Sequence, residues 1–384
     1  MEQRVVVNIF AKLNIRRIVA HIRRYGPQTR ATLTKELGVT PATITRLTSE
    51  LLEHGVMEEI PDPTKKGQKG FPSKLLKLKS ESLLTTGVYF DPDTLYTCVA
   101  DLEGNIITEE QFSIDNRDFH TILTKASQSI HQQLEQSGSD ISRVVGCGVS
   151  YPGQHTDTPG RTLKTQQFAD WPSIDFRNDL AQYFEFPVYH INDAKAACLA
   201  ELYYGACKSH QHYCYIWLSY GIGGAAIIDQ SLYLGHSQVA AEFSGLFPKS
   251  KERPSGQDLL DTLVKEGIEL ERLDQLTDEH LNTPCVKKWV ARSTEQIKWL
   301  CLVIARTFAP DAIVIGGTLH SSLINQIQKS ISEETKLGED FAIQPPKIVR
   351  ATTDIKPQLG AAVLPIDELI NPARYQGRIH KTDR

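Results

Sequence analysis

The segment from Thr29 to Gly55 most narrowly limits what the start of this chain can fold into. It holds two short stretches with helical spacing, separated by Gly38, and the second begins with Thr40 as N-cap and Pro41 at the first helical position. Gly55 then ends the second helix. The polar residues expected on its outer face, where this motif contacts base edges, are Thr40, Thr43, Thr45, Arg46 and Ser49. The segment therefore predicts a helix-turn-helix, a motif that reads DNA.

A supporting helix and a wing are expected on either side of this motif. From Leu13 to Arg24, apolar residues recur on one face of a predicted helix. Its opposite, phosphate-facing side carries Arg16, Arg17, Arg23 and Arg24. Strand-like stretches at 57–60 and 74–79 flank a turn-rich basic loop, whose Lys65, Lys66 and Lys69 are expected to contact phosphates. Residues 1–80 thus predict a winged helix-turn-helix. The alternatives are a three-helix packing module without a ligand and, for the basic helix alone, a solvated or membrane-surface face.

Charge separates this segment from the rest of the chain. Residues 1–80 contain 15 Lys and Arg against 7 Asp and Glu, whereas the remaining residues contain 27 against 39. A basic first part on an acidic remainder favours DNA binding at one end only.

Length and composition indicate further domains. Some 300 residues follow the wing, which is too many for one small module, so two or three domains are expected. The sequence contains neither a run of 18 apolar residues nor a signal-peptide pattern, so we expect a cytoplasmic protein. Its seven scattered cysteines are then expected to be buried free thiols.

The remainder of the chain alternates strand and helix signals. Strands are expected at 84–90, 95–101, 105–108, 144–150, 188–191 and 312–315, with a further pair around Gly221–Gly224. Helices are expected at 119–135, 194–204 and 286–308. This alternation predicts an α/β fold.

Several short motifs occur in an order that resembles the ROK family. They are Gly-Val-Ser-Tyr-Pro-Gly, Ile-Asn-Asp-Ala-Lys-Ala-Ala-Cys-Leu-Ala-Glu, Gly-Ile-Gly-Gly, Ala-Ala-Glu-Phe-Ser-Gly and Ile-Val-Ile-Gly-Gly. The family contains bacterial sugar kinases and sugar-responsive repressors with a winged helix. The resemblance implies an actin-like, hexokinase-type, two-lobed ROK domain at 81–384, with a sugar cleft between the lobes. The small lobe would span about 81–193 plus a C-terminal segment, and the large lobe about 194–365.

The resemblance also implies a set of ligand-binding residues. Asn192 and Asp193 match the family's sugar-binding Asn and the Asp that acts as general base in the kinases, and a carboxylate suits either task. Glu242 matches a sugar-contacting Glu, and Gln167 falls roughly where relatives have a sugar-contacting Asn. An alternative without a ligand is that Asn192 and Asp193 only cap the following helix, a role that can coexist with sugar binding.

The expected nucleotide loops depart from the kinase pattern. Tyr89-Phe-Asp-Pro-Asp93 replaces the Asp-x-Gly-Gly-Thr phosphate loop of the kinases, so it adds carboxylates and loses a backbone donor at Pro92. The glycines that remain in the other loops, interpreted as vestigial, are Gly221, Gly223, Gly224, Gly316 and Gly317. Such glycines can persist as backbone geometry without a nucleotide. We therefore expect that ATP binding is lost.

No metal site is expected either. The family's zinc-binding His and Cys-x-Cys-Gly-x-x-Gly-Cys run are replaced here by Gly245 and by residues 249–257. A second cluster, Cys207-x-x-His210-x-His212-x-Cys214, could offer metal ligands on one strand face, but a polar loop that enters a buried strand is the preferred interpretation.

The sequence thus predicts a transcriptional regulator, with a repressor of carbohydrate-metabolism genes preferred. It would bind double-stranded operator DNA and respond to a sugar or sugar phosphate, without catalytic residues or a cofactor. A homodimer or higher oligomer is expected because one recognition helix reads few base pairs. The alternative is an active ATP-dependent carbohydrate kinase with a DNA-binding appendage.

Overall fold

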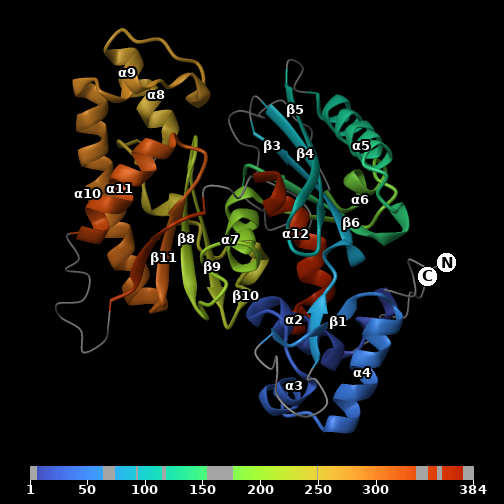
Figure 1. Cartoon of the computed structure of the whole chain (residues 1–384). Helices are drawn as coiled ribbons and strands as arrows, with labels where there is room; N and C mark the ends of the chain where they lie inside the picture. The colour runs from blue at the N-terminus through green and yellow to red at the C-terminus, as the bar shows by residue number, and fades with distance from the viewer. Residues whose placement is uncertain are drawn as a thin grey trace. The chain divides into compact units, whose positions relative to one another are not determined.

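A computed structural model describes residues 7–63, 74–91, 94–114, 118–153, 176–248, 250–333, 345–352 and 357–374 of the 384-residue chain (Figure 1). The chain divides into two compact units. Unit 1 comprises Met1–Ser150, Asp170–His190 and Ala361–Arg384, and unit 2 comprises Tyr151–Ala169 and Ile191–Gly360.

Unit 1 begins with three helices and an antiparallel hairpin. These elements are α2 (Leu13–Tyr25), α3 (Arg30–Leu37), α4 (Pro41–Glu53), β1 (Met57–Pro61) and β2 (Lys74–Leu78). The Thr29 and Thr40 side chains accept hydrogen bonds from backbone amides in the first turns of α3 and α4, and Gly38 ends α3 at φ 62°. The caps that the sequence predicts for α4 are confirmed, and Gly55 has a positive φ of 67° just beyond its end.

The three helices share one apolar core. The side chains of Ile18 on α2, Leu33 on α3 and Ile44 on α4 are fully buried. Burying each such side chain contributes about 1.5–3 kcal/mol. On the predicted apolar face of α2, Ile15, Ile18, Val19 and Ile22 are buried, whereas Leu13 at the start of the helix is 38% exposed.

The rest of unit 1 is built on a five-stranded sheet with the order β5-β4-β3-β6-β7. The strands are β3 (Leu84–Phe90), β4 (Thr94–Asp101), β5 (Ile106–Ser113), β6 (Val144–Tyr151) and β7 (Val188–Asn192). Strand β3 pairs antiparallel with β4 and parallel with β6. The unit also contains η2 (Ser80–Ser82), α5 (Phe119–Gln136), η3 (Ile141–Arg143) and α6 (Phe176–Ala181), and α5 packs on β4 and β5.

Unit 2 contains a second five-stranded sheet, with the order β10-β9-β8-β11-β12. Its strands are β8 (Tyr213–Leu218), β9 (Ile222–Ile228), β10 (Ser231–Leu232), β11 (Ala312–Gly316) and β12 (Lys347–Arg350). Strand β8 pairs antiparallel with β9 and parallel with β11, which repeats the arrangement of β3, β4 and β6 in unit 1. The α/β part of the predicted fold class is therefore confirmed.

The helices of unit 2 include three that the sequence pattern did not predict. The helices are α7 (Asp193–Tyr203), α8 (Gly256–Lys265), α9 (Asp278–Leu281), α10 (Pro284–Phe308) and α11 (Ser321–Glu333). The short helices η5 (His236–Gln238), η6 (Phe243–Leu246) and η7 (Leu273–Gln275) lie between them in the chain. Helix α12 (Pro357–Ile370) begins in unit 2 and continues into unit 1, where η8 (Pro372–Arg374) follows it. No helix within the described ranges is long and apolar enough to span a membrane.

Candidate functional sites

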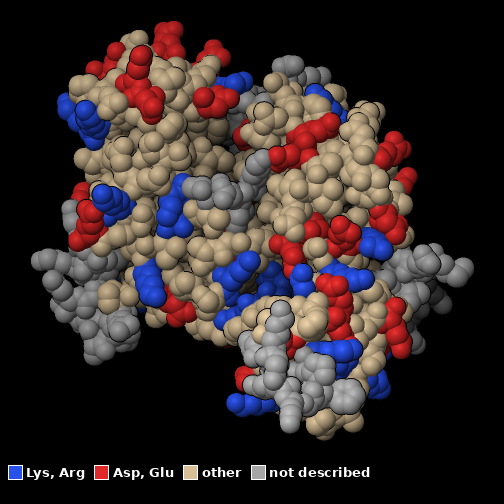
Figure 2. Space-filling model, in the orientation of Figure 1, with Lys and Arg blue, Asp and Glu red and all other residues tan. Residues whose placement is uncertain are grey.

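The outer face of α4 presents polar side chains to solvent. Thr45 and Arg46 are exposed, and Thr43 and Ser49 are partly exposed. The Thr40 hydroxyl donates to the Thr43 hydroxyl at 2.9 Å while it caps the helix. Figure 2 shows basic and acidic side chains interspersed over the region that Figure 1 labels α2 to α4. Arg46 is therefore an exposed cation on α4 within a region of mixed charge.

Two of the arginines expected to face phosphates bind within the protein instead. Arg16 Nε donates to the Phe10 carbonyl at 2.7 Å, and its Nη1 donates to the carbonyls of Glu368 at 2.9 Å and Asn371 at 3.3 Å. Arg17 Nη2 donates to the Leu37 carbonyl at 2.6 Å. The predicted phosphate-facing role is thus wrong for both, because their guanidinium groups bind carbonyl oxygens at helix ends.

The hairpin is tied to the helices by an exposed ion network. Glu59 on β1 accepts from Arg30 at 2.7 Å and from Lys74 at 2.6 Å. The hydrogen bond from Lys74, followed by that from Arg30, lowers the pKa of Glu59. Arg30 Nε also donates to Thr48 on α4 at 2.9 Å, so one guanidinium joins α3, α4 and β1. Lys65, Lys66 and Lys69 lie outside the described residues.

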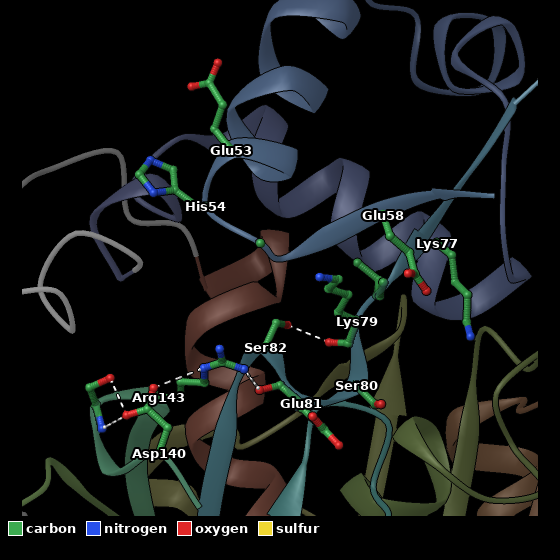
Figure 3. A pocket seen from close by; sticks show the side chains of 13 residues that line it. Glu53, His54, Glu58, Lys77, Lys79, Ser80, Glu81, Ser82, Asp140 and Arg143 are labelled. Carbon is green, nitrogen blue, oxygen red and sulfur yellow. Dashed lines mark hydrogen bonds and ion pairs between the residues drawn. The ribbon is translucent and has the colours of Figure 1, made fainter.

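A groove of about 710 Å³ separates the end of α4 from the sheet that follows in unit 1 (Figure 3). Glu53 and His54 line one wall, and Asp140 and Arg143 line the opposite wall. The segment Lys79–Ser82, which connects the hairpin to β3, also lines the groove. Arg143 donates to the Glu81 carbonyl at 3.1 Å and pairs with Asp140 at 3.3 Å. The groove therefore follows the segment that connects the N-terminal module, made of α2–α4 with β1 and β2, to the five-stranded sheet of unit 1.

A second polar site lies at the start of α7 in unit 2. Asn192 accepts from the Lys195 amide at 3.0 Å and so caps the helix, as the alternative interpretation of this motif predicted. Asp193 accepts from the Ala194 amide at 2.8 Å and keeps part of its surface accessible to solvent. Burial raises the pKa of Asp193 to about 7, and the Glu242 carboxylate acts in the same direction. Asp193 can therefore accept hydrogen bonds or exchange a proton near neutral pH.

Lys195 brings Glu242 to the same site. Lys195 Nζ pairs with Glu242 Oε1 at 2.7 Å, and the Lys195 side chain is 1% exposed, against 18% for Glu242. Three of the predicted ligand-binding residues, Asn192, Asp193 and Glu242, thus belong to one unit and one polar cluster. Gln167 lies outside the described residues.

The sequence interpretation missed three residues of this cluster. Lys195 was the visible signal, because it is a single charge within the apolar run Ala194–Ala200. Trp217 on β8 lies close enough to Asp193 to favour the ionised carboxylate and so lower its pKa, although its Nε1 makes no hydrogen bond among the described residues. Tyr151 is buried, and burial followed by the charge of Asp193 raises the pKa of its phenol well above the usual range.

The glycines interpreted as vestigial nucleotide loops are mostly required by packing. A Cβ on Gly223 would lie 2.6 Å from the Ala194 Cβ, and one on Gly224 would lie 2.4 Å from the Ala241 carbonyl oxygen. A Cβ on Gly316 would meet the Tyr215 hydroxyl at 2.2 Å, and Gly317 has φ +134°. Only Gly221 has open space around it. These contacts explain four of the five glycines without a nucleotide.

The segments around Tyr89 and His212, which the sequence singled out as a nucleotide loop and a metal cluster, make ordinary local contacts. Tyr89 is buried and stacks on Tyr96 with 5.6 Å between ring centroids. His212 precedes β8 and pairs with Asp229 at 3.5 Å. Strand β8 begins only at Tyr213, so His210 and His212 precede it and Cys214 is buried within it. This confirms the preferred interpretation of a polar loop that enters a buried strand and excludes the alternation of the three side chains on one strand face. Within the described ranges, no group of three His, Cys, Asp or Glu side chains could hold a metal ion.

Comparison with known sequences places relatives along most of this chain. A family model described as "ROK family" matches residues 86–257. The uncharacterized protein y4fQ of Sinorhizobium fredii is 30% identical over 329 residues, which cover 84% of this chain and 82% of that protein. The xylose repressor of Bacillus subtilis is 22% identical and matches 94% of this chain and 96% of its own length. NagC of Escherichia coli, a DNA-binding transcriptional dual regulator, is 21% identical with 95% of each chain covered.

Solved structures share the fold at lower identity. A ROK family transcriptional regulator, described as a homologue of the Escherichia coli MLC protein, has a TM-score of 0.73 at 18% identity and covers 96% of this chain and 99% of its own. A ROK family glucokinase from Streptomyces griseus, in complex with glucose and AMPPNP, has a TM-score of 0.58 at 22% identity. It covers 73% of this chain and 98% of its own. The regulator therefore matches nearly the whole chain, and the kinase about three quarters of it.

Proposed function

Since this chain belongs to the ROK family, we propose that it is a DNA-binding transcriptional regulator that represses carbohydrate-metabolism genes. Residues 1–80 would form a winged helix-turn-helix, and residues 81–384 would bind a sugar or sugar phosphate as effector. The relatives that carry the names xylose repressor and NagC support this assignment.

One observation carries the proposal. A capped helix with exposed Thr45 and Arg46, followed by an antiparallel hairpin, precedes the ROK match that begins at residue 86. In helix-turn-helix proteins the recognition helix lies in the major groove with its N-terminal residues on base edges. Here that helix would be α4, whose proposed contacts are Thr40, Thr43, Thr45, Arg46 and Ser49. The wing lysines Lys65, Lys66 and Lys69 would contact phosphates.

The effector would bind at the polar cluster of unit 2. Asn192, Asp193 and Glu242, together with Gln167, are the proposed contacts, since carboxylate and amide groups suit sugar hydroxyls. Helix α12 offers a route from this site to the DNA-binding helices. At one end, a Cβ on its Gly360 would lie 3.1 Å from the Ala196 backbone of α7. At the other end, Arg16 of α2 binds the carbonyl oxygens of Glu368 and Asn371, and Figure 1 shows α12 ending beside α2.

This route gives a physical account of induction. An effector that binds one arrangement of α7 and α12 better than another shifts the equilibrium between them, and with it the operator affinity. The groove along Lys79–Ser82 leaves room for the N-terminal module to move relative to the first sheet.

The kinase remains a second candidate because a ROK glucokinase shares the fold. The glycines of the nucleotide loops do not by themselves support the kinase, since packing accounts for Gly223, Gly224, Gly316 and Gly317 with or without a nucleotide. Sugar-dependent release of ADP from ATP, measured over a panel of hexoses, would instead support the kinase.

A salt-controlled binding titration tests the proposal. The purified chain is titrated against DNA from its own upstream region, with random DNA of equal length as reference. We expect specific binding that one sugar or sugar phosphate releases. Arg46→Ala should weaken specific binding by about 1–3 kcal/mol if Arg46 pairs with a guanine edge. Lys35→Ala, at an exposed position on α3, is the matched control. Absence of specific binding would overturn the proposal, and equal loss on random DNA would make Arg46 a phosphate contact.

A further inference from the structure

The indole N–H of Trp217 is a buried donor that no described residue accepts. Trp217 is 6% exposed, and its Nε1 has no hydrogen-bond partner within the described part of the chain. Native proteins leave few buried donors unpaired, because an unpaired donor loses its hydrogen bonds to water without replacement. The N–H of Trp217 is therefore a donor that a ligand oxygen at the proposed effector site could accept from.

Packing directs this N–H edge toward the start of α7. Because Gly223 on β9 lacks a side chain, it admits both Ala194 and the Cδ1 edge of Trp217. A Cβ at Gly223 would lie 2.6 Å from the Ala194 Cβ and 3.3 Å from Trp217 Cδ1. Nε1 is bonded to Cδ1, so the N–H lies on the same edge of the ring, close to Asp193.

Two carboxylates lie near this edge of the indole. Asp193 and Glu242 both keep some solvent access, and one Glu242 oxygen is bound by Lys195 at 2.7 Å. The charged groups that act on Asp193 are Glu242 and Lys195, and the Tyr151 phenol also faces it. Among the described residues, the cluster therefore offers two carboxylates beside the indole N–H, and the cation between them, Lys195, is already bound by Glu242.

We propose that Trp217 is a specificity-determining residue of the effector site, whose N–H donates to an oxygen of an uncharged polyhydroxy ligand while Asp193 accepts from a neighbouring hydroxyl. Each hydroxyl of such a ligand can donate and accept, so it matches a donor next to carboxylates. A phosphate group at this point would face Asp193 and Glu242, with Lys195 already bound to Glu242, and the like charges would repel it. The inference rests on the proposed function and narrows its effector class from sugar or sugar phosphate to the unphosphorylated sugar.

A ligand-free measurement tests the placement of the indole. Tryptophan emission of the full chain is followed from pH 5.5 to 8.5 in the wild type, Trp217→Phe, Asp193→Asn and Trp299→Phe. Trp299 is 47% exposed on α10 and is the matched control. We expect a transition near pH 7 in the wild type and in Trp299→Phe, and its loss in the other two variants. A transition that persists in Trp217→Phe, or that is missing in the wild type, would overturn the placement.

Calorimetric titrations test the ligand contact. The probes are D-xylose, D-glucose, N-acetyl-D-glucosamine and D-glucose 6-phosphate. We expect an unphosphorylated sugar to bind the wild type and Trp299→Phe equally, and Trp217→Phe about two- to tenfold more weakly, as for one lost hydrogen bond. Asp193→Asn, nearly identical in shape, is the second variant if Trp217→Phe does not fold, and it should also weaken binding.

The outcomes separate this inference from the proposed function. Unchanged affinity in Trp217→Phe, or preferential binding of the 6-phosphate, would overturn the inference and leave a sugar-responsive regulator intact. If no probe binds the wild type, both the inference and the sugar-effector part of the proposed function are overturned, whereas specific operator binding would still support a DNA-binding role.

Discussion

Lys195 and Glu242 form an ion pair whose two members differ in exposure. The ammonium group is shielded from solvent, whereas the carboxylate keeps 18% of its side-chain surface accessible. Removing one partner of a shielded pair leaves the other charge without its counter-ion, and this costs more than breaking an exposed pair. The pair therefore fixes the orientation of a proposed effector contact.

Lys195→Met should lower the free energy of unfolding by about 3 kcal/mol, because the partly buried Glu242 carboxylate loses its ion pair with the Lys195 ammonium group. Urea unfolding at pH 7.5 measures the change. The control is Lys329→Ala, which removes an exposed pair with Glu333 and should cost less than about 0.5 kcal/mol. Equal effects in the two variants would contradict a shielded pair at Lys195.

Asp193 should make the protein less stable as the pH rises. Its pKa is raised from 3.8 to about 7, so the folded state holds a proton that the unfolded state has lost between these values. Stability therefore falls from about pH 4 to pH 7 and stays low above it, by at most about 4 kcal/mol. Asp193→Asn should remove this slope and raise stability at pH 8, which urea unfolding between pH 5 and pH 8.5 would measure. A variant as pH-dependent as the wild type would exclude Asp193 as the titrating group.

At the scale of elements, helix-capping residues and apolar periodicity predicted where helices begin and end. The Thr40 cap and Pro41 fix the start of α4, and a regular apolar spacing predicted α10 at 286–308, close to its observed bounds of Pro284–Phe308. Helix α12 was not predicted because Pro365 lies inside it, and a proline normally indicates the end of a helix. The hydrogen bonds from Arg16 to the carbonyl oxygens of Glu368 and Asn371 were not predicted either, since these residues lie 352 and 355 positions away in the sequence.

Arg16 should stabilise the junction of α2 with the end of α12. Arg16→Ala removes three hydrogen bonds to carbonyl oxygens and is expected to lower the free energy of unfolding by about 2–3 kcal/mol. Arg16→Lys should recover part of this loss, since one ammonium keeps the charge but not the planar fork. Urea unfolding of both variants, with Lys35→Ala as the exposed control, measures the effect. A loss no greater than that of the control would contradict the junction.

At the scale of the whole molecule, the sequence predicted the kind of fold better than the contents of the site. The alternation of strands and helices was sufficient to predict an α/β fold. It did not predict that the two sheets arrange their five strands in the same order. The effector cluster was only partly predictable, because Trp217 and Lys195 join it through the packing of β8 and α7 rather than through a local motif.

The homodimer expected from the sequence makes a prediction about operator length. One α4 helix contacts few base pairs, so a homodimer should need two half-sites spaced by about one DNA turn, roughly 10 base pairs. Inserting 5 base pairs between the half-sites rotates them to opposite faces of the duplex. We expect binding by the wild type to fall to the level of random DNA, and a 10-base-pair insertion to weaken it less. Binding indifferent to the spacing would contradict a symmetric dimer on the operator.

The packed glycines of unit 2 bear on how such chains diverge. Gly223, Gly224, Gly316 and Gly317 lie where a methyl group would strike a neighbouring strand or loop, or where the backbone disfavours other residues. Selection for a stable fold alone would retain them through any change of activity. A glycine signature in a ROK chain is thus inherited with the scaffold, and its survival does not measure whether a descendant still transfers phosphate.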